Sequence, residues 1–313
     1  MSNKISRRAA LKNLGALGAA GITLGATAPV DASDDNPRHY TIADLDLSTP
    51  EMRNQVIAKV MGSIAEEETH AFLRFHVYGY AGKNIIPFFS LNNYVVQKWQ
   101  PMAEPGSYQV RHYEVGYYAE FDTDKPISHW QNAITGETIE LEQFVLGPVV
   151  RQYTPAGVKS PGIAPKPLRV NVIGDRVFVP AQSIESFPNM FSPEEWPELS
   201  NEAVIYWDSM YTYSASLRDV LNPKLSSAPA EIHAQNLTSW HPYLRLGRTP
   251  GRIMVRAFGT NFSGFDALEP NVRSAFEKYT PEIFDTDNWT DLRFDSVDYY
   301  QKMMAKKKRE QAQ

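Results

Sequence analysis

The stretch from Tyr108 to Phe121 constrains the fold more than any other part of the sequence, because both of its alternate faces mix aromatic, apolar and titratable side chains. A strand of this length would span about 45 Å, at roughly 3.3 Å per residue. Strands usually have about five or six residues, so one this long suits a strongly coiled sheet or a barrel. His112, Glu114 and Tyr118 share one face, as the lining of a small-molecule cavity would require.

Other segments show the same alternation and are bounded by Gly, Pro, Asn and Asp residues, which predicts further antiparallel strands. The turn at residues 81–84 indicates a hairpin, and the first half of the chain is expected to form a meander. The predicted fold is mainly β, either an antiparallel lipocalin-like barrel or a strongly coiled sheet. The additional strands and hairpins are predicted at residues 69–80, 85–96, 138–145, 169–180, 204–217 and 252–258.

Helices are expected to flank this sheet on the N-terminal and C-terminal sides. The tract 49–51 (Thr-Pro-Glu) provides a cap, a proline at the first helical position and an acidic first turn, and a helix of about 15 residues is predicted to follow. Two C-terminal helices are predicted at residues 270–279 and about 294–309. The segment 147–167 is rich in Pro and Gly, which predicts a long loop or lid over the meander.

The N-terminal segment has the pattern of an export signal, with basic residues, an apolar run rich in Gly and Ala, and small residues before a cleavage site. The pair Arg7-Arg8 resembles that of a twin-arginine leader, and a Sec leader is the alternative. We predict an export signal at residues 1–32, a mature chain that begins at Ser33, and a single β-barrel-like domain with C-terminal helices at residues 33–313. The predicted location is the periplasm. The apolar run is too short to span a membrane.

Composition excludes several classes of function. The chain has no cysteine, so disulfides, thiolate nucleophiles and cysteine-ligated metals are excluded. The formal net charge is −5, and removal of the basic leader makes the remainder more acidic. Nucleic acid is not an expected partner, because the only dense basic run lies at residues 306–309. Beyond the leader, the sequence also lacks nucleophile-elbow, phosphate-loop, zinc-helix and dinucleotide-binding patterns.

The first candidate site combines two predicted strands, with Arg74 and His76 on one and His112, Glu114 and Tyr118 on the other. A His beside a carboxylate can act as a general base, and Arg or Tyr can stabilise an oxyanion. We therefore predict His112 as the base and Glu114 as its partner. Two alternatives stay open: the residues are structural, or His76, His112 and Glu114 bind a metal. The expected site uses neither a metal nor another cofactor.

Two aromatic tracts provide further candidates. Residues 130–137 form a predicted turn that ends in Thr-Gly-Glu, and residues 240–243 offer a wall for an aromatic ligand, with His241 as a second group for proton transfer. Each tract could instead anchor a packed loop. The ligand-binding candidates outside the first site are Trp130, Asn132, Tyr213, Trp240 and Tyr243.

Two long tracts, YEVGYYAEFDTDKPISHWQNAITGETIELEQF and LTSWHPYLRLGRTPGRIM, together resemble a bacterial exported family catalogued as domain of unknown function 1838. The resemblance covers most of the mature chain and implies neither an activity nor a cofactor. One tryptophan that is usual in the second tract is Tyr243 here. The family's tryptophan and Asn-Pro-x-Thr-Gly-Glu turn are matched by Trp130, Asn132, Thr135, Gly136 and Glu137, with Ala133 in place of the proline.

These observations together predict a cofactor-independent lyase or isomerase that acts on a hydrophobic, aromatic (phenolic) small molecule by general acid/base catalysis in a barrel cavity. A periplasmic carrier with the same pocket and no chemistry is the first alternative, and a structural envelope protein is the second. The expected partner is a small hydrophobic or aromatic ligand, with no nucleic acid and no integral membrane span. The sequence specifies no oligomeric state.

Overall fold

The computed structural model describes residues 40–141, 144–160, 163–189, 191–285 and 304. Every described element belongs to the unit that comprises residues 40–313. The predicted export signal and nearly all of the predicted helix at 294–309 lie outside the described residues. Among the described residues, no helix is both long and apolar enough to cross a membrane.

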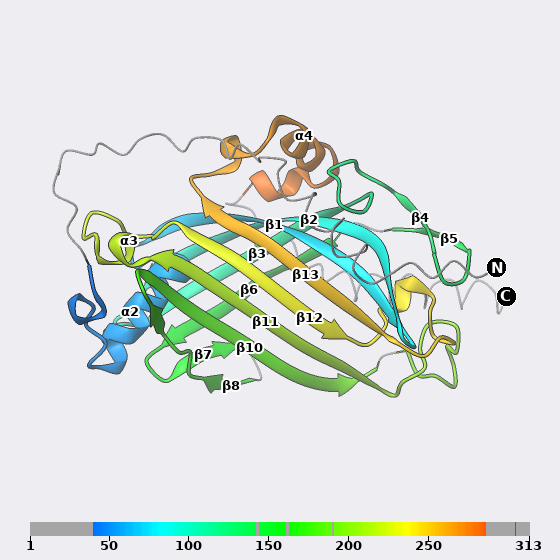
Figure 1. The fold of residues 1–313 in the computed structure, drawn as a ribbon, viewed down its shortest axis with the longest axis horizontal. Coiled ribbons are helices and arrows are strands. Elements are labelled where there is room, and N and C mark those ends of the chain that lie inside the picture. The colour runs from blue at the N-terminus through cyan, green and yellow to red at the C-terminus, as the bar shows by residue number, and fades with distance from the viewer. Residues whose placement is uncertain (1–39, 142–143, 161–162, 190, 286–303, 305–313) are drawn as a thin grey trace, which may run out of the picture. The chain divides into compact units, whose positions relative to one another are not determined.

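An eleven-stranded antiparallel sheet is the main element of the described chain. Strands β10 to β13 lie in front of β2, β3 and β6 in Figure 1, so the sheet curls into a half-barrel. The prediction of a mainly β fold is confirmed in its coiled-sheet form. The strands in sheet order are β8 (Ile163–Lys166), β7 (Gly157–Ser160), β6 (Phe144–Thr154), β3 (Tyr108–Ala119), β2 (Asn84–Pro101), β1 (Glu67–Ala81), β13 (Arg252–Phe262), β12 (Ala230–Thr238), β11 (Val204–Ser216), β10 (Arg176–Pro188) and β9 (Asn171–Ile173).

The sheet consists of two meanders that join at β1 and β13. The first runs outward from β1 to β8, and the second runs from β9 back to β13, so the first and last strands pair at the centre of the sheet. A two-stranded hairpin of β4 (His129–Gln131) and β5 (Thr138–Glu140) interrupts the first meander. The short elements are η1 (Ile42–Asp44), α3 (Leu217–Leu221), η2 (Pro242–Leu244), η3 (Phe265–Ala267) and η4 (Pro281–Phe284).

Helix α2 (Pro50–Met61) begins where the sequence predicts, with the Thr49 side chain accepting a hydrogen bond from the Met52 amide at 3.2 Å. It ends earlier than predicted, at Met61, and Gly62 follows it. A Cβ at Gly62 would lie 2.0 Å from the Trp99 ring, so this residue must be glycine for the chain to pass the indole. Residues of α2 then pack against apolar side chains from both meanders and fill one end of the half-barrel.

Helix α4 (Pro270–Tyr279) confirms the first of the two predicted C-terminal helices and covers part of the outer face of the sheet. Phe276 is fully buried there, with ring centroids 5.6 Å from Tyr94 and 5.1 Å from Tyr117. The side chains that alternate with Tyr94 and Tyr117 therefore point to the concave face.

The segment 147–167 is not a loop or lid, which corrects the prediction. Most of it belongs to β6, β7 and β8, at one edge of the sheet. Pro148 lies at a register shift between β6 and β3, where a missing backbone donor costs little, so proline does not break the strand. The sequence also gave no prediction of a strand at β12, although β12 completes the second meander.

Candidate functional site

His112 and Glu114 lie on the concave face of β3. They sit on either side of the register shift between β3 and β6, and they share their face with the buried side chain of Val110. Tyr211 of β11 interacts electrostatically with Glu114 although four strands separate β11 from β3 in the sheet. The curl of the sheet therefore brings β3 and β11 opposite each other across the interior.

A chain of hydrogen bonds fixes the His112 ring. The Trp99 Nε1–H donates to Gln97 Oε1 at 3.0 Å, and Gln97 Nε2 lies 3.1 Å from His112 Nδ1. Because an indole nitrogen only donates, the Gln97 oxygen must face Trp99 and its amide N–H must face the imidazole. His112 Nδ1 is therefore the acceptor, and Nε2 carries the proton that it donates to Glu114 Oε2 at 3.0 Å.

Glu114 receives a second hydrogen bond from the Asn93 side-chain amide, on its other carboxylate oxygen. Burial alone would raise the pKa of Glu114, but the hydrogen bonds from His112 and Asn93 and the positive charge of Arg151 together lower it. The Asn93 Oδ1 atom is buried and, among the described residues, has no hydrogen-bond partner. The site therefore holds an ionised carboxylate beside an unsatisfied amide oxygen.

The imidazole of His112 is neutral at physiological pH. Burial lowers its pKa and the nearby Arg151 lowers it further, and this outweighs the opposing effect of Glu114. Both ring nitrogens are engaged, and the side chain is 8% exposed against 13% for Glu114. The carboxylate of Glu114 is thus the more exposed of the two groups.

Arg151 and three tyrosines complete the polar part of the concave face. Arg151 and Tyr153 come from β6, and Tyr211 and Tyr213 come from β11. Burial raises the pKa of each of these phenols, so they remain protonated donors at neutral pH. Tyr213 was a sequence candidate, whereas Arg151 was missed because its segment was predicted to be a loop.

The other end of the concave face is aromatic. The ring of His241 stacks on Trp207 with centroids 5.5 Å apart and contacts Tyr243 edge to face, also at 5.5 Å. The Tyr118 hydroxyl donates to the Tyr243 hydroxyl at 3.3 Å. Burial lowers the pKa of His241 to about 4 and raises that of Tyr243 to about 12, so both are neutral at pH 7. Three sequence candidates, Tyr118, His241 and Tyr243, therefore meet here.

The pKa of His241 predicts a dependence of stability on pH. As pH falls from 6.5 towards 4, the unfolded chain takes up a proton at this residue before the folded chain does, so stability is lost across that range and no further below it. The loss attributable to His241 is expected to be about 3 kcal/mol at most. Chemical denaturation of wild type and of His241→Gln at several pH values measures this loss of stability. His233→Gln, at an exposed histidine, is the control. Parallel pH profiles for wild type and His241→Gln would contradict this expectation.

Arg74 and His76 do not join this site, which corrects the predicted cavity. They point to the outer face of β1, because the alternate residues Leu73 and Phe75 pack on the concave side. Arg74 pairs with Asp124, and His76 lies beside the aromatic ring of Phe121. The alternative metal set of His76, His112 and Glu114 is consequently not brought together. No group of three or more metal-ligating side chains lies among the described residues.

Trp130 and Asn132 serve the framework around the aromatic end. The Asn132 side chain is buried, donates to the Leu244 carbonyl at 3.0 Å and accepts from the Ile134 amide at 2.9 Å. Trp130 packs against Phe88 with ring centroids 4.7 Å apart. The two tracts that resemble the family therefore contact each other, and together they hold the segment that carries His241 and Tyr243.

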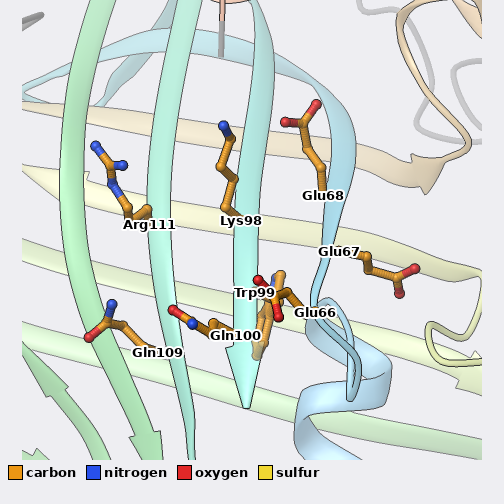
Figure 2. Close-up of a pocket in the computed structure, with 8 residues that line it drawn as sticks. All are labelled: Glu66, Glu67, Glu68, Lys98, Trp99, Gln100, Gln109 and Arg111. Carbon is orange, nitrogen blue, oxygen red and sulfur yellow. The ribbon is translucent and has the colours of Figure 1, made fainter. Parts of the chain in front are cut away.

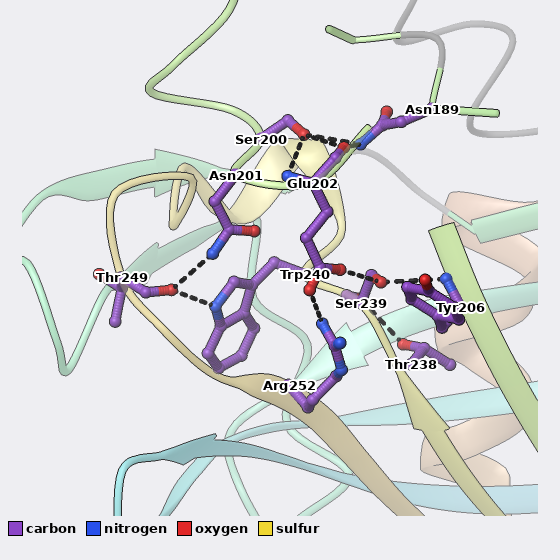
Figure 3. Close-up of polar contacts among 10 residues, drawn as sticks. All are labelled: Asn189, Ser200, Asn201, Glu202, Tyr206, Thr238, Ser239, Trp240, Thr249 and Arg252. Atoms are coloured by element: carbon purple, nitrogen blue, oxygen red, sulfur yellow. Dashed lines mark hydrogen bonds and ion pairs between the residues drawn. The ribbon is translucent and has the colours of Figure 1, made fainter. Parts of the chain in front are cut away.

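A polar network anchors the same segment from the other side (Figure 3). The Glu202 carboxylate accepts hydrogen bonds from Arg252 and from Ser239 Oγ, the latter at 2.6 Å. Trp240 is 3% exposed, and its indole N–H donates to the Thr249 carbonyl at 2.7 Å. Trp240 is therefore a structural anchor beside His241 and not a wall that a ligand could touch.

A surface pocket lies apart from this site, on the outer face at the end of β1, β2 and β3. Figure 2 shows Lys98 and Arg111 projecting from neighbouring strands, with Glu68 across from Lys98. Opposite charges in register compensate one another, so this pocket does not select an ion of one sign. Its lining residues are Glu66, Glu67, Glu68, Lys98, Trp99, Gln100, Gln109 and Arg111.

The fold and the site together define a half-barrel protein with a concave face that is polar at one end and aromatic at the other. Residues 77–304 match the family described as "Protein of unknown function (DUF1838)", and the chain belongs to this family. The matched region includes both family tracts and every residue of the concave site described above except Leu73 and Phe75, which precede it in the sequence. No curated protein sequence matches the chain.

Proposed function

We propose that the protein is a cofactor-independent lyase or isomerase that binds a hydrophobic, aromatic small molecule on its concave face. In this proposal Glu114 accepts a proton from the substrate while His112 holds the carboxylate in place. The observation that carries the proposal is the ionised Glu114, fixed by His112 and Asn93 at the polar end of a concave face whose other end is aromatic.

The energetics support a functional role for this carboxylate. Removing an ionised carboxylate from water is costly, and an apolar side chain at the same position would pack without that cost. Titratable groups with displaced pKa values gather at functional sites, and Glu114, His112 and Tyr211 all belong to this class. The tyrosine hydroxyl can donate to an oxyanion that develops when Glu114 removes a proton.

The aromatic end supports the class of ligand. Trp207, His241 and Tyr243 are only partly buried on the concave face, so a ring can still contact them. Their neutral, flat surfaces suit an aromatic molecule better than a charged peptide.

A carrier without chemistry is the second candidate. The specific observation in its favour is that both nitrogens of His112 are engaged, so the imidazole cannot easily move protons. Incubation of the purified protein with aromatic monomers and dimers, followed by mass spectrometry, distinguishes the enzyme from the carrier. New products at catalytic rates support the enzyme, whereas tight binding of unchanged compounds supports the carrier.

We also propose export to the periplasm by the twin-arginine route, on the basis of the pair Arg7-Arg8 and the apolar run behind it. Replacing both arginines by Lys is expected to leave the precursor in the cytoplasm. Cell fractionation and immunoblotting measure this. Continued export of the double variant that stops when the Sec machinery is inhibited would contradict the route.

A further inference from the structure

Arg151 is a cation on the concave face that forms no ion pair among the described residues. It lies opposite Val110 in the β6–β3 ladder and two positions before the buried Tyr153, so its side chain points to the interior. Its charge lowers the pKa of His112 and of Glu114, which places the guanidinium near both. The Tyr153 phenol takes part in one side-chain hydrogen bond with Arg151. A guanidinium has five N–H donors, so an interior one is costly to hold unless it finds further acceptors.

The surroundings of Arg151 are suited to an anion. The hydroxyls of Tyr211 and Tyr213 lie across the interior, and both interact electrostatically with Arg151. Neutral phenols can donate to an anion without repelling it, and the planar guanidinium fork matches a carboxylate with two parallel hydrogen bonds. Glu114 repels a second negative charge, so an anionic group is favoured only on the Arg151 side of that carboxylate.

The aromatic end lies some distance along the same strand. Tyr213 and Trp207 share the concave face of β11 and are six residues apart, which corresponds to about 20 Å. A ligand that contacts both ends must therefore be elongated. We propose that Arg151, with Tyr211 and Tyr213, binds the carboxylate of an elongated aromatic acid whose ring system lies against Trp207 and His241. This inference rests on the proposed function, in that the ligand occupies the concave face.

Binding of 8-phenyloctanoate, an acid long enough to approach both ends of the concave face, and of its neutral methyl ester tests the inference by calorimetry. The wild-type protein is expected to bind the acid at least tenfold more tightly than the ester. Arg151→Gln should reduce this ratio to about one, and Arg151→Lys should keep part of it because the charge remains. Arg111→Gln, on the outer face of β3, is the matched control and should leave the ratio unchanged.

The acid-to-ester ratio compares two ligands on one protein preparation. Partial unfolding of a variant would lower both apparent affinities equally and leave the ratio unchanged. An acid-to-ester ratio that stays the same in Arg151→Gln would overturn the inference, as would equal binding of the two probes or no binding of the acid by the wild type. Turnover of aromatic compounds without preference for acids would leave the proposed function standing and remove this inference. Acid selectivity that depends on Arg151, without turnover of any compound, would support this inference and contradict the proposed catalytic function.

Discussion

Glu114→Gln is expected to lower kcat by about 10² to 10⁴, because positioned proton transfer contributes that much to an acid/base reaction. The folded structure should change little. The carboxamide oxygen of the variant can still accept from His112 Nε2–H, and a flip of the Asn93 amide would turn its unpartnered Oδ1 towards the new carboxamide N–H. Turnover of an identified substrate and the melting temperature are the two measurements.

Glu114→Ala is the control for this variant. It leaves the His112 N–H and the Asn93 amide without their acceptor, so it is expected to cost about 1–3 kcal/mol of stability in addition to activity. A Glu114→Gln variant that is folded and fully active would contradict the role of Glu114 as the base. The proton acceptor would then have to be sought at His241.

Trp240→Ala is expected to destabilise the protein by about 3–5 kcal/mol, because it removes a buried indole from the core around Phe88 and leaves a cavity. It also removes the donor to the Thr249 carbonyl. Chemical denaturation measures the change in the free energy of unfolding.

The same substitution at Trp207 is the matched control. Trp207 is only partly buried, on the concave face, so Trp207→Ala is expected to cost clearly less stability and to weaken aromatic ligand binding instead. Equal loss of stability for the two variants would contradict the assignment of Trp240 to the framework and Trp207 to the ligand site.

The alternation of side chains was sufficient to predict most of the sheet. The segments that became β1, β3 and β11 carry it, β2 was predicted as the hairpin partner of β1 and β13 as an apolar strand, and Thr49 and Pro50 marked the start of α2. The pattern failed for β6 to β8, because Pro and Gly are typical of loops in general and the sequence does not reveal a bulge or an edge strand. Arg151 lies in that segment and was therefore not predicted as a site residue.

The alternation of side chains could not predict which residues come together in the concave site. A strand pattern separates two faces but does not say which one becomes concave, so Arg74 and His76 were assigned to the wrong side. The contact between Gln97 and His112 follows from the register of β2 against β3, where the two residues are direct partners. Tyr211 reaches Glu114 only because the whole sheet curls.

The indole N–H resonances in a ¹H–¹⁵N NMR spectrum, recorded during titration with 8-phenyloctanoate, test most directly whether the concave face is the ligand site. The Trp207 signal, assigned from its loss in Trp207→Phe, is expected to shift in a saturable way, whereas the signal of the buried Trp240 should move much less. A saturable binding curve with no movement of the Trp207 signal would place the ligand elsewhere and contradict the account.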